Sequence, residues 1–182
     1  VRDLDLALVS VWEIIGEAGK GSGCVVSANG LILTSLHVVE DHGGGISAGL
    51  YGAVSLNHEK PPEELFSLEA VAVDRDRDLA LLQVVSGLYG QPLPAGYSFP
   101  YLRLSDSRRV AIGEVLAFVG FPGIGGIGSR PTVSLTKGVV SGFFRTEFGR
   151  YIKTDATISH GSSGGAALNR EWELVGVPVV TI

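Results

Sequence analysis

The stretch GSGCVVSANGLILTSLHVV (residues 21–39) decides the fold. Its apolar run 24–27 leads into Asn29-Gly30, and an Asn-Gly pair between apolar runs is a strong signal for a β-hairpin. The run 31–35 then returns as the second strand of that hairpin. The glycine-rich segment 19–23, which precedes the hairpin, predicts a turn.

The same alternation of apolar runs and turns continues along the chain, and only the first ten residues have a helical pattern. Such closely spaced short strands predict an all-β sandwich or barrels rather than a parallel sheet. Residues 86–98, which contain two prolines and three glycines, are the best linker candidate and divide the chain into β units at 1–90 and 91–182. The further predicted strands span residues 11–15, 50–56, 68–73, 79–85, 115–120, 132–144, 151–158, 166–168 and 174–182.

Composition excludes several classes of protein. The 182 residues are 45% hydrophobic with a net charge of −5, which predicts a folded core and argues against a nucleic-acid binder. Cys24 is the only cysteine and lies in an apolar run, so we expect a core residue, no disulfide and no multi-cysteine zinc site. No apolar stretch is long enough for a membrane-spanning helix. Because the chain has no Met, we expect its natural start, with any targeting segment, to lie outside it.

Three residues stand in contexts that suit nucleophilic catalysis. His37 follows the strand 31–35, and Asp78 opens the apolar run 79–85, where a buried carboxylate needs a partner such as a His N–H. Ser163 lies in GSSGG (residues 161–165), whose backbone N–H groups can converge on one point, as an oxyanion requires. Each residue alone has an ordinary structural explanation, but the order His, Asp, Ser in these contexts is more specific than its parts.

Three rival motifs fail on their sequence context. GSSGG also fits the nucleophile elbow of α/β-hydrolases, but no His follows Ser163 as that fold requires, which argues against an esterase. The G-x-G-x-x-G pattern at 123–128 is followed by strand-like residues where a dinucleotide site needs a helix. His37 and His42 in HVVEDH do not share a helical face, so neither a metal nor another cofactor is expected.

The chain resembles the trypsin-like serine peptidases, and among them the protease domain of the bacterial HtrA/DegP type. The likeness rests on residues 21–39, on DRDRDLALL (74–82), on 115–142, and on TDATISHGSSGG (154–165), which is similar to the family's TDAAINPGNSGG. It spans roughly residues 11–182, and no PDZ domain is expected within these residues. The resemblance implies two antiparallel six-stranded β-barrels with the active site in the cleft between them. The last strand of the second barrel is expected to be missing from this chain.

The same resemblance assigns the site residues. It implies a catalytic triad of His37, Asp78 and Ser163, and an oxyanion hole at residues 161–163. The family's Pro and Asn are replaced by His160 and Ser162, which leaves the triad intact but puts the rigidity of the oxyanion turn in question. The oxyanion hole is assigned to Gly161, Ser162 and Ser163, and substrate binding to Thr157, Ile158, His160, Pro178, Val179, Val180 and Thr181.

By implication the substrates are polypeptides, unfolded or extended, cleaved after small or medium apolar residues. The segment 179–181 is expected to pair with the substrate as an added strand. A bacterial periplasmic or other extracytoplasmic location follows from the resemblance, with homo-oligomers and a membrane anchor outside these residues left open. The alternative to a serine endopeptidase is a non-catalytic peptide-binding module that keeps the trypsin-like fold.

Overall fold

Six antiparallel strands close into a barrel in the first half of the chain. The computed structural model describes residues 2–122 and 130–179, and the barrel order is β1-β2-β3-β6-β5-β4, with β4 pairing back onto β1. Closure leaves no exposed strand edge, and alternate side chains fill the interior. The strands are β1 (Val11–Ile15), β2 (Lys20–Val25), β3 (Leu31–Ser35), β4 (Leu50–Val54), β5 (Glu63–Asp74) and β6 (Leu79–Gly87).

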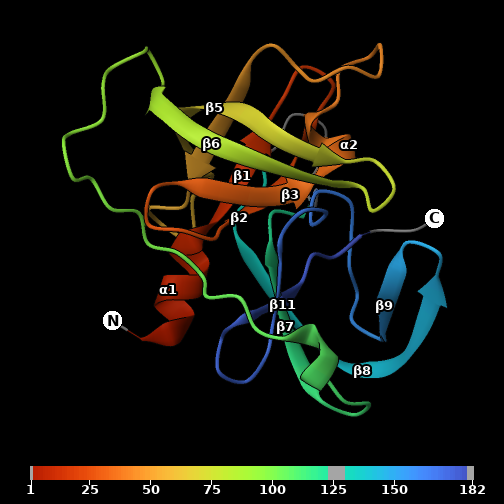
Figure 1. Cartoon of the computed structure of the whole chain (residues 1–182). Helices are drawn as coiled ribbons and strands as arrows, with labels where there is room; N and C mark the ends of the chain where they lie inside the picture. Colours follow the sequence, from red (N-terminus) through yellow and green to blue (C-terminus); the bar gives the residue numbers. More distant parts are fainter. Residues whose placement is uncertain (1, 123–129, 180–182) are drawn as a thin grey trace.

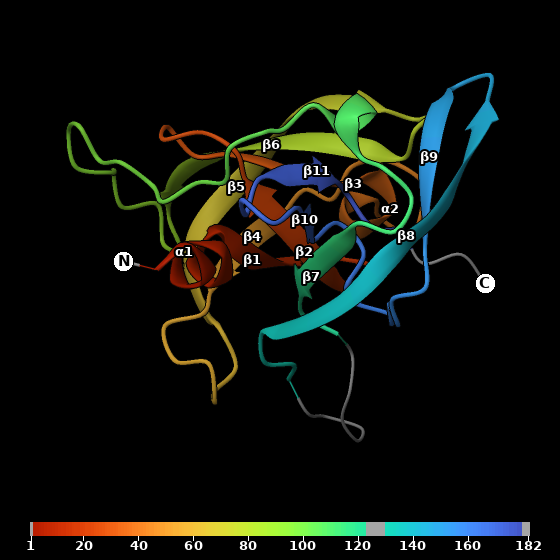
Figure 2. The ribbon, with the colours of Figure 1, turned by 90° about the horizontal axis from the view of Figure 1, so that it is seen from below.

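The second half of the chain forms a curled sheet with the order β11-β10-β7-β8-β9. The predicted all-β fold class is therefore confirmed, although the second unit has five strands within the described residues rather than six. Figure 1 shows the barrel above this sheet, and in Figure 2 the long strand β8 crosses the view. The strands are β7 (Val115–Gly120), β8 (Ser134–Thr146), β9 (Gly149–Thr154), β10 (Ala166–Leu168) and β11 (Leu174–Gly176).

Within the described residues, three short helices complete the fold, namely α1 (Asp3–Ser10), α2 (Leu36–Val39) and the 3₁₀ helix η1 (Ser107–Arg109). Helix α1 confirms the helical pattern predicted for the first ten residues. Its Ala7 packs in a buried cluster with Cys24 of β2 and Leu168 of β10, so this cluster joins the barrel to the sheet. Cys24 is fully buried, as predicted, and burial raises the pKa of its thiol.

The prediction of a turn at residues 19–23 was wrong, because β2 begins at Lys20 and runs through these glycines. A Cβ at Gly21 would lie 2.5 Å from a methyl group of Val38, and one at Gly23 would lie 2.8 Å from a methyl group of Ile32. Glycine is required here because neighbouring elements press against the strand, and not because the chain turns.

The final strand is shorter than predicted. Strand β11 ends at Gly176, whereas the sequence predicted a strand that continues through residue 182. Pro178 has no backbone N–H to donate to a ladder, and its carbonyl accepts a hydrogen bond from Gly164 N at 3.3 Å. Residues 180–182 lie outside the described part of the chain.

Candidate active site

His37 and Asp78 meet at one end of the barrel. His37 lies on α2, directly after β3, and Asp78 lies in the turn between β5 and β6. Asp78 Oδ2 is 2.6 Å from His37 Nδ1, and Asp78 Oδ1 accepts a hydrogen bond from His37 N at 2.9 Å. The carboxylate therefore binds both the ring and the backbone of His37. An Nδ1–H that donates to Asp78 leaves Nε2 unprotonated and able to accept a proton.

The backbone at Asp78 is held in an unusual conformation. Its φ of +55° is left-handed, a region that costs a residue with a Cβ about 1 kcal/mol. The carbonyl of Asp78 accepts a hydrogen bond from Leu36 N at 3.0 Å, which adds a third link to the segment that carries His37. These three hydrogen bonds offset the strain and turn the carboxylate toward the imidazole.

The charged residues before Asp78 are paired with other partners. Arg77 donates to Asp74 at 2.8 Å and Arg75 donates to Glu40 at 3.0 Å, and both arginine side chains are more than half exposed. The hydrogen bond from Arg77 lowers the pKa of Asp74. Segment 74–77 is therefore a solvated face, and it leaves the Asp78 carboxylate to His37.

Ser163 lies in a tight turn between β9 and β10, formed by residues 159–165, which we call the Ser163 turn. Two glycines have left-handed backbones, Gly161 with φ +90° and Gly164 with φ +83°. The turn is pinned by hydrogen bonds from Ser162 N to Ser159 O at 3.1 Å and from Gly165 N to Ser162 O at 3.0 Å. Only glycine tolerates such φ values without strain, which explains why GSSGG can form this turn.

Several amides of the Ser163 turn have no acceptor among the described residues, and two of them lie on either side of the Ser162 amide. Among the described residues, neither Gly161 N nor Ser163 N donates a hydrogen bond to another protein group. Ser162 N, in contrast, is occupied by Ser159 O. A pair of N–H groups without acceptors on one tight turn can stabilise a developing negative charge.

The Ser163 turn lies against the segment that carries His37. A Cβ at Gly164 would be 3.0 Å from Ser35 N, and a Cβ at Gly21 would touch both Val38 and the carbonyl oxygen of Ser163. Ser163 is only 6% exposed. Within residues 2–122 and 130–179, no hydrogen bond joins Ser163 Oγ to His37. Such bonds are often long in enzymes without substrate, so the arrangement is compatible with a nucleophile and its base.

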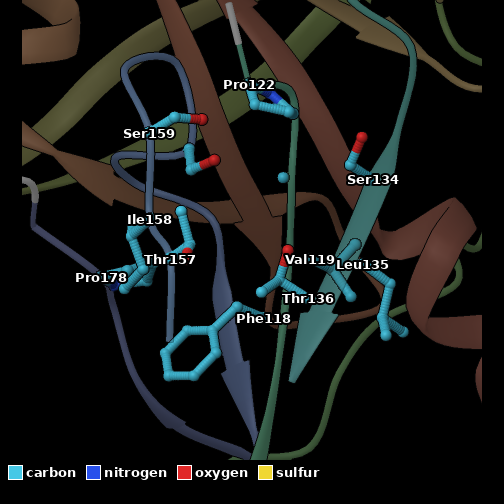
Figure 3. Close-up of a pocket in the computed structure, with 12 residues that line it drawn as sticks. Phe118, Val119, Pro122, Ser134, Leu135, Thr136, Thr157, Ile158, Ser159 and Pro178 are labelled. Carbon is cyan, nitrogen blue, oxygen red and sulfur yellow. The ribbon is translucent and has the colours of Figure 1, made fainter. Parts of the chain in front are cut away.

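A pocket of about 300 Å³ opens beside the Ser163 turn. Three predicted substrate-binding residues line it, Thr157, Ile158 and Pro178. Figure 3 shows Ile158 and Pro178 on one side of the pocket, across from Leu135. Its walls are mostly apolar, and no charged side chain is among the lining residues, which are Phe118, Val119, Gly120, Pro122, Ser134, Leu135, Thr136, Thr157, Ile158, Ser159, Ser162 and Pro178.

Other predicted binding residues lie outside this pocket. His160 is exposed in the Ser163 turn and does not line the pocket, and Val179 is 40% exposed beyond β11. Val180 and Thr181 lie outside the described residues, as does the G-x-G-x-x-G pattern at 123–128. In the part of the chain that is described, no group of three His, Cys, Asp or Glu residues could bind a metal ion, and no helix is long and apolar enough to cross a membrane.

The sequence pointed to the three candidate catalytic side chains but not to the residues that support them. Strands β7 and β8 supply one wall of the pocket through residues such as Phe118 and Leu135, which look like ordinary core residues in the sequence. Ser22 of β2 donates from Oγ to Gly161 O at 2.7 Å and from its backbone N to Ser163 O at 2.9 Å. A serine between two glycines carries no sequence signal for such a role.

Comparison with known proteins places this arrangement in a family. Residues 21–177 match the trypsin-like peptidase domain. A probable periplasmic serine endoprotease of the DegP-like kind from Chlamydia pneumoniae is 31% identical over 166 residues, which cover 88% of this chain and 28% of that protein. Serine protease HTRA1 from Xenopus laevis is 31% identical over 173 residues, which cover 91% of this chain and 32% of that protein.

The fold agrees with these relatives. A solved structure of a variant of the HtrA-type protease AlgW with a tripeptide superposes with a TM-score of 0.73 at 25% identity, covering 96% of this chain and 52% of that one. The trypsin-like fold class is therefore confirmed. The chain belongs to the trypsin-like peptidase domain family, and its relatives support serine endopeptidase function of the HtrA/DegP kind. The chain spans about a third or less of the length of these curated relatives.

Proposed function

We propose that this domain hydrolyses peptide bonds with Ser163 as the nucleophile, His37 as the general base and acid, and Asp78 as the residue that orients His37. The observation that supports the proposal is that the Asp78 carboxylate contacts both His37 Nδ1 and His37 N, beside the Ser163 turn. The contact with Nδ1 favours the ring tautomer that a base requires, because a proton on Nδ1 leaves Nε2 free to accept one.

In the proposed reaction, Ser163 Oγ attacks the carbonyl carbon of the substrate as His37 Nε2 takes the hydroxyl proton. The negative charge on the carbonyl oxygen is stabilised by the two free amides, Gly161 N and Ser163 N. His37 then gives the proton to the leaving amine, which leaves an acyl group on Ser163. Water, activated by His37, releases that acyl group. Because Ser162 N donates to Ser159 O, the oxyanion is assigned to two amides and not to three.

The pocket beside the Ser163 turn supports a preference for a small or medium apolar side chain before the cleaved bond. Thr157, Ile158 and Pro178 line it, and no carboxylate is among the described residues of its lining. A substrate Lys or Arg would therefore bury its charge without a partner, which is costly. The segment at Val179, a residue that is 40% exposed, is the place where an extended substrate would add as a strand.

We also propose polypeptides as substrates and an extracytoplasmic location. Several similar proteins are named periplasmic serine proteases, which is the support for this location. Assembly into homo-oligomers and attachment to a membrane anchor outside these residues stay predictions. A trypsin-like fold without catalysis is the competing function, and turnover measurements separate the two.

The test is hydrolysis of a peptide panel that differs only in the residue before the cut. We expect the highest kcat/KM with Val, Ala or Leu at that position, and loss of hydrolysis in Ser163→Ala. Ser55→Ala is the matched control, because Ser55 is also a buried serine and its hydroxyl has no partner among the described residues. Cleavage best after Arg would contradict the proposed specificity, and no cleavage by the unaltered chain would contradict the proposed reaction.

A further inference from the structure

One peptide group of the Ser163 turn is held from both ends. The amide of Ser162 donates to Ser159 O at 3.1 Å, and the carbonyl of Gly161 accepts from Ser22 Oγ at 2.7 Å. The N–H and C=O of one trans peptide point in opposite directions, so both hydrogen bonds oppose the same rotation. Gly161 itself resists rotation weakly, because glycine has no Cβ to restrict its backbone.

Ser22 reaches the turn from the other half of the molecule. It lies on β2 of the barrel, is fully buried, and its Oγ also accepts from Phe121 N at 2.9 Å. Because the Phe121 amide supplies a proton to that oxygen, the hydroxyl proton of Ser22 is directed at Gly161 O. Figure 1 shows β2 next to the upper end of the sheet that contains β7 and β11.

The backbone of Ser22 continues the same connection. Its N–H donates to Ser163 O at 2.9 Å, and its carbonyl accepts from Thr34 Oγ1 at 2.7 Å. Thr34 belongs to β3, the strand that leads into His37. Ser22 is thus bonded both to the strand that precedes the proposed base and to the turn that carries the proposed nucleophile.

We propose that Ser22 is a positioning residue, which holds the Gly161–Ser162 peptide so that the amides of Gly161 and Ser163 face one oxyanion. This inference rests on the proposed function of Ser163. Without the Ser22 hydroxyl, the Gly161 carbonyl loses its partner, and only the hydrogen bond from Ser162 N to Ser159 O still opposes rotation of the peptide. That peptide lies between the two peptides that carry the Gly161 and Ser163 amides, so its rotation changes how these two amides are directed relative to each other.

The first measurement does not depend on activity. Amide hydrogen exchange at Ser162, followed by NMR, is expected to be about tenfold faster in Ser22→Ala, the change that one lost hydrogen bond produces. Ser55→Ala, which removes a buried hydroxyl without a described partner, is expected to exchange like the unaltered chain. Should Ser22→Ala not accumulate as folded protein, Ser22→Cys keeps a side-chain atom in place as a weak donor and gives the same comparison. Unchanged exchange in the Ser22 variant would overturn the proposal.

The second measurement is peptide hydrolysis by the same variants. Misplaced oxyanion donors act on the transition state, so kcat is expected to fall about 10- to 100-fold with KM within about twofold. A purely structural role would leave kcat per folded molecule unchanged. A Ser22→Ala kcat within about twofold of the Ser55→Ala value would overturn the proposal, as would an effect confined to KM. If the unaltered chain hydrolyses no peptide, the proposed function fails, and the exchange measurement alone decides whether Ser22 holds the turn.

Discussion

Replacing Asp78 by Asn removes one charge while keeping the shape of the side chain. Asp78 presents one oxygen to the backbone N–H of His37 and the other to His37 Nδ1. The single oxygen of Asn is expected to keep the backbone hydrogen bond, which places the NH₂ group against Nδ1. Since NH₂ only donates, Nδ1 must become an acceptor and the ring proton moves to Nε2. His37 then cannot take the proton of Ser163.

The expected loss in kcat is on the order of 10⁴, which corresponds to about 5.5 kcal/mol of transition-state stabilisation. Peptide hydrolysis gives the rate, and ¹⁵N NMR of the His37 ring reports which nitrogen carries the proton. Asp74→Asn is the matched control, because Asp74 ends β5 just before the turn that holds Asp78 and pairs with Arg77 instead. We expect that control to retain activity within about threefold, since an exposed ion pair contributes little. A kcat for Asp78→Asn within tenfold of the unaltered value would refute the assignment of Asp78.

Three further predictions concern stability and reactivity. Arg130→Ala is expected to lower the free energy of unfolding by about 3 kcal/mol, because it leaves the fully buried Glu13 carboxylate without its partner. Urea unfolding measures this loss, and a loss below about 1 kcal/mol would argue against a stabilising Arg130–Glu13 ion pair. Gly164→Ala is expected to lower the melting temperature more than Gly113→Ala. Both glycines have a positive φ, but only a Cβ at Gly164 would meet other atoms, the nearest at 2.2 Å. Equal shifts in melting temperature would contradict this steric argument. Cys24 is expected to resist iodoacetamide at neutral pH until the chain unfolds, because burial raises its pKa, and rapid alkylation of the folded chain, followed by mass spectrometry, would show otherwise.

Local signals in the sequence predicted the strands well. The Asn29-Gly30 turn joins β2 and β3 as expected, with Val25 opposite Ile32 in the register. This prediction succeeded because a short hairpin turn depends on neighbours in the chain. The turn predicted from the glycines at 19–23 was wrong, because the residues that require glycine there lie far away in the sequence. Gly21 makes room for Val38, and no local pattern carries that information.

The same distinction applies to the site. His37 and Asp78 could be predicted as partners because one follows a strand and the other opens one. Ser22 could not, because its role arises from a bond to Gly161, which is 139 residues further along the chain. The pocket walls were also missed in part, since Phe118 and Leu135 lie on strands whose apolar residues suit any core.

The nucleophile itself can be tested by labelling the chain with a fluorophosphonate and mapping the modified residue by peptide mass spectrometry. This reagent requires a serine activated by its base and an oxyanion site that is already assembled. The account predicts a single modified residue, Ser163, with labelling lost in Ser163→Ala and kept in Ser55→Ala. Absence of labelling at neutral pH, or labelling that persists in Ser163→Ala, would contradict the assignment of Ser163 as the nucleophile.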